Sequence, residues 1–526
     1  MKYQWMVLAA CCAVTMSSCI NDLDVTPIDP SVSGEFDQDA VFAKGYASLA
    51  LTGQSGPAGN GDVDGIDEGT SGFIRLIWNL NELTTDEAIC SWGDPGVPEM
   101  NFINWSSTHS QLEGLYGRLY FGVTLANHFL EKTAGQTDEK SIKQIAETRF
   151  LRALNYYVLL DMFGNVPFTT TVSSEKAKQI QRADLFKFIE EELLDIVADQ
   201  YEPNAAPYGR ADKAASWMLL SRLYLNAEVY TGTARWVDAV KYAEMVIDAS
   251  YELSPSYAEL FMADNDINVN AMKEIIFPIR QDGVNSQSYA GMHFVIASTH
   301  TAGMGNWGST QGWSGNRGRQ ALANKFFADG VPAVGGVAEN VALAGDDRAM
   351  FFTYGTYEDN GVEKVFESKL PIVIYNQFFE GLPIAKFTNL RSDGAPASNS
   401  EFVDTDMPYF RLAEAYLTFA EANLRAGGDA AKSLEKVNVL RARANATPLS
   451  AIDLNTILDE KCREFYFEGQ RRVDLIRYGY FTSSSYLWDW KGGKPEGTGV
   501  SPIYNLMPIP FSDINANENL VQNKGF

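Results

Sequence analysis

The sequence predicts a mainly α-helical protein, in which paired helices form a scaffold that carries long insertions of loops and short strands. Several segments repeat apolar residues at intervals of three and four, as helices with one buried face do. Between them lie stretches rich in glycine, asparagine and serine, where this periodicity is lost. The chain has 526 residues, 45% of them hydrophobic, which is enough for a large core.

Two parts of the chain, 142–250 and 409–480, are predicted to form helical hairpins. The individual helices are expected at 142–163, 212–229, 236–249 and on either side of Gly427 within 409–445. Gly164 ends the first helix, because glycine readily adopts the left-handed backbone that closes a helix. Val237 is expected on the apolar face of the 236–249 helix. Helix pairs of this kind are similar to tetratricopeptide repeats, but their irregular spacing predicts an interrupted array.

Two insertions, at about 53–105 and 279–407, are expected to carry the function, as long irregular segments on a rigid scaffold often do. The stretch Gly305–Arg319 places Trp307 and Trp313 among glycine, serine and asparagine. Large aromatic rings usually go where they can be buried. Two tryptophans on a polar, glycine-rich loop therefore indicate either a binding surface or rings that pin the loop to the core.

Residues 1–18 are predicted to be a lipoprotein signal peptide. Lys2 precedes an apolar segment that is too short to cross a membrane, and small residues follow it. The ending Ser17-Ser18-Cys19 resembles bacterial lipoprotein signals, in which the chain is cut before the cysteine and acyl chains, palmitate among them, are attached to it. Residues 19–40 would then be a lipidated tether for a body at 41–526. The alternative is an ordinary secretory signal with an incidental Cys19.

Composition excludes several classes of function. The net charge is −25, whereas nucleic-acid binders and proteins that adhere to anionic lipid need basic patches. No phosphate-binding loop or dinucleotide fingerprint is present, and the four histidines are not paired at zinc-ligand spacing. Among 67 acidic residues no pair stands out as a glycosidase pair. The chain is therefore predicted not to be an enzyme. Cys90 and Cys462 could form one disulfide or stay as thiols.

Three long stretches resemble one family, the SusD/RagB lipoproteins of the outer membrane of Bacteroidetes. They are FLRALNYYVLLDMFGNVPF (150–168), EFYFEGQRRVDLIRYGYF (464–481) and MPIPFSDINANENLVQNKGF (507–526). The resemblance implies a helical body with tetratricopeptide-like pairs, anchored by lipid at the extracellular face of the outer membrane. It also implies a partner, a TonB-dependent transporter of the SusC type that the protein covers as a lid. Shorter stretches such as GDVDGIDEGTSGFIR and YLWDWKGG resemble a starch-binding member, which implies binding of starch and maltooligosaccharides without catalysis.

The resemblance assigns site residues by position in this sequence. It implies that Trp92, Tyr289 and Trp313 are aromatic platforms and that Asp67 and Arg75 are polar contacts. An indole can stack on the apolar face of a glucose ring, while a carboxylate and a guanidinium bond its hydroxyl groups. Several aromatic rings in an arc would match the curvature of amylose. The alternatives are ordinary packing for the rings and a solvated ion pair for the two charges.

Some residues depart from the pattern of the starch-binding member, and the resemblance also implies a metal site away from the sugar. A further tryptophan is replaced by Cys90, and a hydrogen-bonding asparagine is replaced near Asp94-Pro95; Trp307 has no counterpart. The resemblance also implies a structural Ca²⁺ ion, a hard cation that suits carboxylate ligands. Its ligands would be Asp266, Asp404 and Asp406, and the alternative is a set of acidic surface loops. A binder of another glycan and a tetratricopeptide-type adaptor for proteins stay open as alternative functions.

Overall fold

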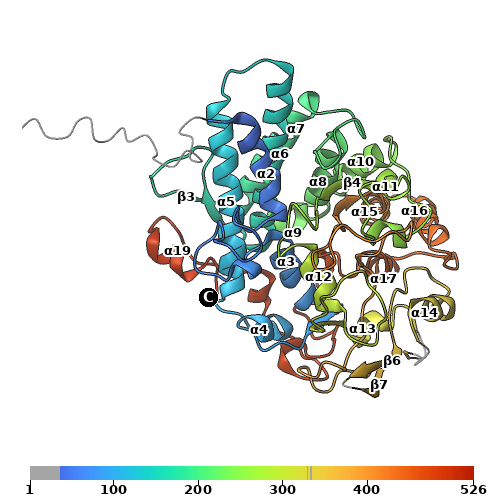
Figure 1. The fold of residues 1–526 in the computed structure, drawn as a ribbon. Coiled ribbons are helices and arrows are strands. Elements are labelled where there is room, and N and C mark those ends of the chain that lie inside the picture. Colours follow the sequence, from blue (N-terminus) through green and yellow to red (C-terminus); the bar gives the residue numbers. More distant parts are fainter. Residues whose placement is uncertain (1–35, 328–329, 332–334, 360) are drawn as a thin grey trace, which may run out of the picture. The chain divides into compact units, whose positions relative to one another are not determined.

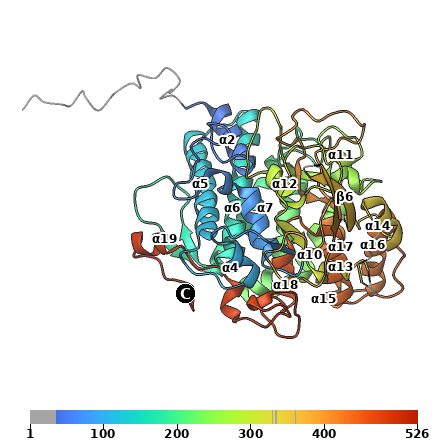
Figure 2. The same cartoon turned by 60° about the horizontal axis from the view of Figure 1, so that its bottom comes forward.

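The computed structural model describes residues 36–327, 330–331, 335–359 and 361–526. The predicted signal peptide, Cys19 and most of the predicted tether lie outside these residues. Residues 42–526 form one compact unit, and α2 (Gln38–Ala50) is the first described helix. The unit is mainly helical, as predicted, and its strands are short and occur in pairs (Figures 1 and 2).

Three long helices form one side of the unit: α5 (Ser110–Lys132), α6 (Glu139–Met162) and α7 (Arg182–Ile196). Figures 1 and 2 both show α5 and α6 side by side, and α7 packs on α6. The Asp138 carboxylate caps α6 by accepting a hydrogen bond from the Ser141 N–H at 3.0 Å. Gly164, with φ of 74°, closes α6 where the sequence predicts, and β2 (Val166–Phe168) then pairs with β3 (Lys178–Ile180).

The second helical layer brings together hairpins that are far apart in the sequence. Its helices are α8 (Lys213–Leu225), α9 (Ala227–Thr231), α10 (Trp236–Ile247), α15 (Leu412–Arg425), α16 (Ala430–Arg443), α17 (Leu454–Phe465) and α18 (Arg471–Arg477). Helix α10 packs against both α8 and α15, which joins the two hairpin regions into one core. Gly427 separates α15 from α16 as predicted.

Val237 is a correction to the expected apolar face of α10, because its side chain is 72% exposed. The buried positions of this helix are Ala239, Tyr242, Ala243 and Val246. They follow the three- and four-residue spacing of one helix face, and Val237 lies outside that spacing.

The long insertion closes on itself through a strand pair at its two ends. Strand β4 (Ile275–Ile279) pairs antiparallel with β8 (Met407–Arg411), with Ile279 opposite Met407. A second pair, β1 (Ala88–Cys90) with β5 (Asn316–Gly318), connects the two insertions to each other. The remaining strands, β6 (Tyr354–Asp359) and β7 (Val362–Glu367), form a hairpin. The chain thus leaves the helical scaffold and returns to it at neighbouring points.

Short helices fill the remaining segments. They are α3 (Phe73–Trp78), the π-helix η2 (Asn79–Leu83), α4 (Val97–Phe102), α11 (Ala271–Glu274), α12 (Met292–Thr299), α13 (Gln320–Ala323), α14 (Val337–Ala344) and α19 (Phe511–Ala516). Single 3₁₀ turns are η1 (Glu68–Thr70), η3 (Val197–Asp199), η4 (Ala258–Phe261), η5 (Lys491–Gly493) and η6 (Pro502–Asn505).

A buried ionic cluster holds β8 against α17. The Arg411 guanidinium donates to the Glu464 carboxylate at 2.6 Å and to Glu468 at 2.8 Å, and all three side chains are buried. Arg348 and Arg443 also pair with Glu464. Buried charges are tolerated only when they are paired and hydrogen-bonded in this way. The charged residues of the stretch 464–472 therefore stabilise the buried core through ion pairs rather than binding a ligand.

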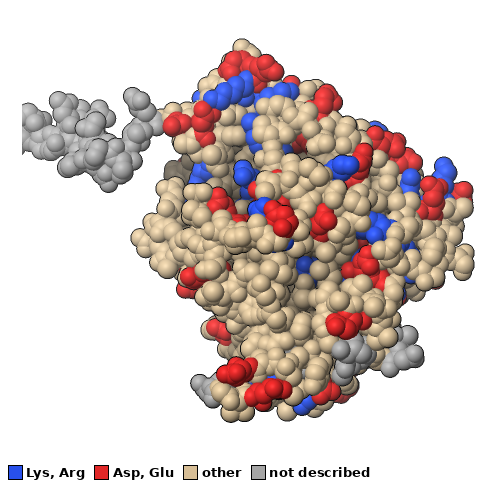
Figure 3. Space-filling model, turned by 45° about the vertical axis from the view of Figure 1, so that its right-hand side comes forward, with Lys and Arg blue, Asp and Glu red and all other residues tan. Residues whose placement is uncertain are grey.

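Charged side chains are mixed on the molecular surface. On the face shown in Figure 3, acidic and basic residues lie among one another, and no broad basic area is seen. In the described part of the chain, no helix combines the length and the apolarity that a membrane crossing needs.

Candidate functional site

The pairing of β1 with β5 brings two of the predicted aromatic residues together. Trp92 lies just after β1 and Trp313 just before β5, so the antiparallel register places them at the same end of the pair. Their ring centroids are 6.4 Å apart, and both side chains are partly exposed. The backbone fixes this arrangement, because the Ser91 N–H donates to the Gly315 carbonyl at 3.0 Å and the Trp313 N–H to the Ala297 carbonyl at 2.6 Å.

Tyr289 extends the pair to a row of three rings. Its ring centroid lies 6.4 Å from that of Trp313, and its side chain is also partly exposed. The Tyr289 hydroxyl donates to the Glu401 carboxylate at 3.2 Å. We call the three rings of Trp92, Trp313 and Tyr289 the first aromatic platform. Trp92 precedes the other two by about 200 residues in the sequence, and the fold brings all three together.

The glycines of the 305–319 loop let its backbone lie flat against indole rings. A Cβ atom on Gly315 would lie 2.1 Å from Cε2 of Trp92 and 2.5 Å from Nε1. A Cβ atom on Gly312 would lie 2.8 Å from Cζ2 of Trp307. Such close approach of backbone to a ring requires glycine. The glycine content of this loop thus serves to hold tryptophan rings in fixed positions.

Buried rings of helix α12, which were not predicted from the sequence, pack against the platform. The Phe294 ring lies 6.1 Å from Trp92, and the His293 ring lies 5.1 Å from Trp313. Phe402, which is also buried, contacts both His293 and Tyr289 at about 5 Å. Burial lowers the pKa of His293 to about 4, so this ring is neutral at physiological pH. Tyr289 lies before the start of α12, so no helical spacing in the sequence links it to His293.

Arg75 and Asp67 lie beside the same rings. The Arg75 guanidinium stacks over Phe294 at 4.5 Å and donates from Nη1 to the Gly69 carbonyl at 2.8 Å. Burial lowers the pKa of Arg75, and the nearby Asp67 charge opposes that shift. Asp67 is exposed and accepts a hydrogen bond from the Thr70 hydroxyl at 3.2 Å. The turn that carries Asp67 also lies against Tyr289, because a Cβ atom on Gly69 would be 3.2 Å from Cβ of Tyr289.

Cys90 lies in the core beneath the platform. Its side chain is buried, and its backbone exchanges two hydrogen bonds with the Asn101 side chain at 3.0 and 2.7 Å. Burial raises the pKa of its thiol to about 12. Cys462 is buried in α17, and both residues are free thiols, which answers the open question of their pairing.

Trp307 packs within its own loop, whereas Asp94 and Pro95 lie exposed on the surface. Trp307 stacks on His300 with centroids 5.3 Å apart, and its Nε1 donates to the Gln311 carbonyl at 3.0 Å. Trp313 Nε1 donates to the side-chain oxygen of the same Gln311 at 3.2 Å. Trp307 therefore belongs to the loop that holds Trp313 but makes no ring contact with the platform. Asp94 and Pro95 are exposed.

Two of the three aspartates predicted to bind calcium, Asp404 and Asp406, accept hydrogen bonds from protein donors. Asp406 accepts from the Gln281 N–H at 2.5 Å and from the Tyr208 hydroxyl at 2.9 Å, and Asp404 accepts from the Gly283 N–H at 2.8 Å. Burial raises the pKa of Asp266. Among the described residues, no three carboxylate, histidine or cysteine side chains are arranged to hold a metal ion. Burial raises the pKa of Asp406, and the charge of Asp266 raises it further, while the charge of Asp404 adds to the raised pKa of Asp266. The three carboxylates therefore lie near one another, and the calcium site stays a prediction.

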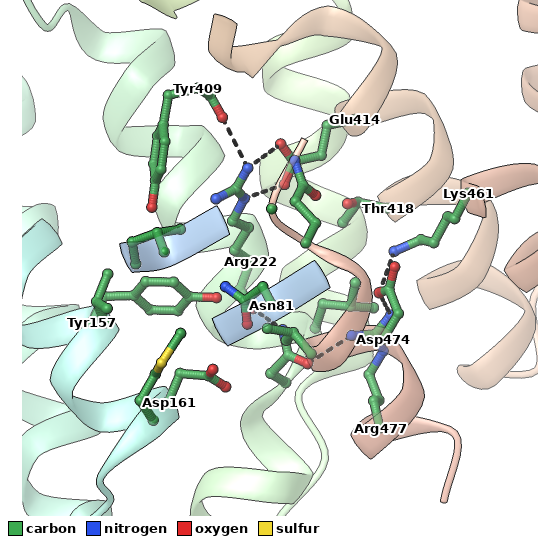
Figure 4. A pocket seen from close by; sticks show the side chains of 18 residues that line it. Asn81, Tyr157, Asp161, Arg222, Tyr409, Glu414, Thr418, Lys461, Asp474 and Arg477 are labelled. Carbon is green, nitrogen blue, oxygen red and sulfur yellow. Dashed lines mark hydrogen bonds and ion pairs between the residues drawn. The ribbon is translucent and has the colours of Figure 1, made fainter. Parts of the chain in front are cut away.

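A polar pocket of about 50 Å³ lies where the helical layers meet, away from the platform residues (Figure 4). Its charged side chains are paired with each other: Arg222 with Glu414, and Lys461 with Asp474 at 3.1 Å. Asn81, from the π-helix η2, turns its side chain into the pocket, and its oxygen has no protein partner. The volume suits a few water molecules that bond such groups. None of the predicted site residues lines this pocket.

Comparisons with known proteins identify the family. Residues 273–526 match the model of the SusD family, and residues 28–225 match a model described as starch-binding and associating with the outer membrane. The chain is 46% identical to the starch-binding protein SusD of Bacteroides thetaiotaomicron, over 97% of this chain and 96% of that protein. It is 26% identical to the SusD-like protein P25 of Formosa agariphila, over 77% of each chain. The chain belongs to the SusD family, as the sequence analysis expected.

Solved structures agree in fold. A SusD-like protein from Bacteroides fragilis aligns with a TM-score of 0.70 at 21% identity, covering 95% of this chain and 100% of that one. A laminarin-binding SusD-like protein aligns with a TM-score of 0.66 at 19% identity, covering 94% and 100%. The mainly helical fold class is therefore confirmed. The relatives whose names state a function are binding proteins, which is the class that the sequence analysis expected in place of an enzyme.

Proposed function

We propose that this protein binds starch and maltooligosaccharides at the cell surface without cleaving them. The observation that carries the proposal is the first aromatic platform. Three rings from distant parts of the chain form one partly exposed row, with Asp67 and Arg75 beside it. The kinship with a starch-binding relative at 46% identity supports starch as the ligand.

The geometry suits a curved glucan chain. Successive rings are 6.4 Å apart and tilted by 53° and 46° to their neighbours, so the ring faces do not lie in one flat plane. Stacking of each ring on a sugar face removes apolar area from water, which contributes about 25 cal/mol per Å². The buried rings of Phe294 and His293 fix the platform before the ligand arrives, which lowers the entropy cost of binding.

The proposal includes a place in the cell and a partner. A lipid on Cys19 would hold the protein on the outer membrane, and many copies on one starch molecule would bind by avidity. The bound oligosaccharide would then pass to a TonB-dependent transporter of the SusC type. The family model whose description names the outer membrane supports this placement. Metabolic labelling with a palmitate analogue tests the lipid anchor, and Cys19→Ala should abolish the label. Co-purification of this protein with the transporter tests the partner.

Affinity electrophoresis tests the sugar. The protein is run in gels that contain amylopectin, dextran or xylan, and retardation by amylopectin alone is expected. Trp313→Ala should lose most of this retardation. Trp307→Ala is the matched control, since it removes the same side chain from the same loop but deletes no ring of the platform. Because Trp307 and Trp313 both bond Gln311, the melting temperature of this variant checks that the loop keeps its shape. Retardation by xylan or dextran in place of amylopectin would show that the platform binds another glycan.

Two further measurements separate the remaining alternatives. Incubation with amylose followed by a reducing-end assay should show no release of sugar, and sustained release would make the protein a hydrolase. Calcium binding by Asp266, Asp404 and Asp406 is tested by thermal unfolding in CaCl₂ and in EDTA. A calcium-dependent rise in melting temperature that Asp404→Asn abolishes would establish the ion.

A further inference from the structure

A second cluster of partly exposed aromatic rings joins the two insertions to the loop at residue 490. Phe102, Tyr375 and Trp490 come from three separate segments, and their ring centroids are 5.0, 5.3 and 5.6 Å apart. The loop that carries Tyr375 also presents Phe378 and Phe379, which are 40% and 45% exposed. The amide side chains of the intervening Asn376 and Gln377 are exposed as well. The cluster thus combines ring faces with neutral hydrogen-bonding groups.

The buried Arg317 and the partly exposed Glu380 hold the 371–380 loop in a fixed shape. The Arg317 guanidinium, which is 3% exposed, donates to the carbonyls of Tyr375 at 2.9 Å, Gln377 and Glu380. The Glu380 carboxylate accepts from the N–H groups of Val373 at 2.7 Å and Ile374 at 2.6 Å. A loop whose backbone is bonded in this way keeps its exposed rings in place before any partner arrives.

Trp490 is held in a conformation that tryptophan rarely adopts. Its φ is 66°, in the left-handed region, where the side chain of any residue other than glycine crowds the backbone. The indole Nε1 donates to the Ile372 carbonyl at 3.1 Å, and the adjacent Asp489 accepts from the Ile372 N–H at 3.1 Å. Backbone strain of this kind concentrates at binding sites. The loop of Trp490 contacts α4, which ends at Phe102, and the two lie side by side in Figures 1 and 2.

We propose that Phe102, Tyr375 and Trp490 form a second glucan-binding platform, which stacks on sugar rings of the same polymer as the first. This inference rests on the proposed function and deepens it. The presence of an indole and a phenol beside two free amides favours a neutral carbohydrate over a charged ligand.

The short strand β5 connects the two platforms. Trp313 precedes it, Arg317 within it holds the 371–380 loop, and Arg319 after it donates to the Asp489 carbonyl beside Trp490. Both platforms are therefore fixed to one rigid strand pair. Two platforms in fixed relation bind a long glucan more tightly than either alone, because the second contact forms at high effective concentration.

The experiment compares polymer with short oligosaccharide. Trp490→Gly removes the ring and relieves the left-handed backbone, so the variant should fold; circular dichroism and melting temperature check this. Trp490→Tyr keeps a ring and serves as the conservative control. We expect Trp490→Gly to raise the apparent Kd for amylopectin in affinity gels about tenfold. The Kd for maltoheptaose at the first platform, measured by calorimetry, should stay within twofold of the parent protein. Tyr375→Ala should repeat both results.

The Trp313→Ala background separates the two proposals. In this background residual amylopectin retardation should remain, and Trp313→Ala with Trp490→Gly should lose it. If the parent protein is not retarded by amylopectin, the proposed function itself is wrong. If the parent and Trp313→Ala behave as proposed, but Trp490→Gly and Tyr375→Ala match the parent on amylopectin, only the second platform is refuted. The cluster would then be assigned to contact with another protein.

Discussion

The substitution Gly315→Ala tests whether the position of the Trp92 ring, rather than its mere presence, determines glucan binding. A Cβ atom at residue 315 would lie 2.1 Å from the Trp92 ring, whereas ordinary contact begins at 3.4 Å, so the indole must move by about 1.3 Å (3.4 − 2.1). The backbone of Gly315 does not have a positive φ, so alanine adds no strain of its own. The change displaces a platform ring without deleting an aromatic residue.

The expected effect follows from the area that the ring would cover. Stacking one indole face on a sugar buries roughly 80 Å², less than half of what a fully buried tryptophan loses. At about 25 cal/mol per Å², this contact is worth about 2 kcal/mol, or about thirtyfold in Kd. Isothermal titration with maltoheptaose measures that change. The intrinsic fluorescence spectrum reports whether the indole environment has shifted.

Gly312→Ala is the matched control for this substitution. It introduces the same methyl group into the same loop, 2.8 Å from Trp307 instead of Trp92. The affinity for maltoheptaose should stay within twofold, because Trp307 does not contact the platform rings. If Gly315→Ala shifts the fluorescence but keeps the parent affinity, Trp92 is not part of the binding surface, and the reasoning fails.

Three further predictions concern stability and thiol chemistry. Burial opposes the charge of Glu464, but the surrounding arginines outweigh it and hold its pKa well below the usual range. Its stabilising contribution is therefore present at neutral pH and is lost as the pH falls below 4.5, and Glu464→Gln should lower the free energy of unfolding by about 3–5 kcal/mol in urea titrations at pH 7. Burial raises the pKa of Glu87 from 4.5 to about 7. Between these pH values the unfolded chain has already lost this proton while the folded protein keeps it, so the free energy of unfolding falls as the pH rises. Glu87→Gln should flatten that part of a plot of melting temperature against pH. Iodoacetamide should label Cys90 and Cys462 only after denaturation, as mass spectrometry will show, because both thiols are buried and free; labelling of the native protein would contradict this burial.

Helix ends could be predicted from the sequence because the signals that determine them are local. Gly164 and Gly427 close helices through their own backbone conformation, and Asp212 caps α8 by bonding the Ala215 N–H three residues on. Each of these effects depends on a few neighbouring residues. Val237 was misplaced because several registers of an apolar face fit a short helix, and only packing against α8 and α15 selects one.

The candidate site could be predicted only in part. Resemblance to a family supplied Trp92, Tyr289 and Trp313, but the rings that support them come from α12 and from residue 402, which no local pattern connects. Cys90 stands where the resemblance places a further tryptophan, yet its side chain is buried, as are the other residues of β1. Contacts between distant segments decide such details, and one sequence read alone does not reveal them.

The strand pair β4–β8 gives the 280–406 segment an entrance and an exit at the same place. Loops between these strands can be replaced while the helices on either side stay joined, provided that buried partners of the core such as Arg348, which pairs with Glu464, are kept. Natural variation can therefore exchange these recognition loops as a cassette on a retained core. Transplanting this cassette between relatives is a direct route to altered sugar preference.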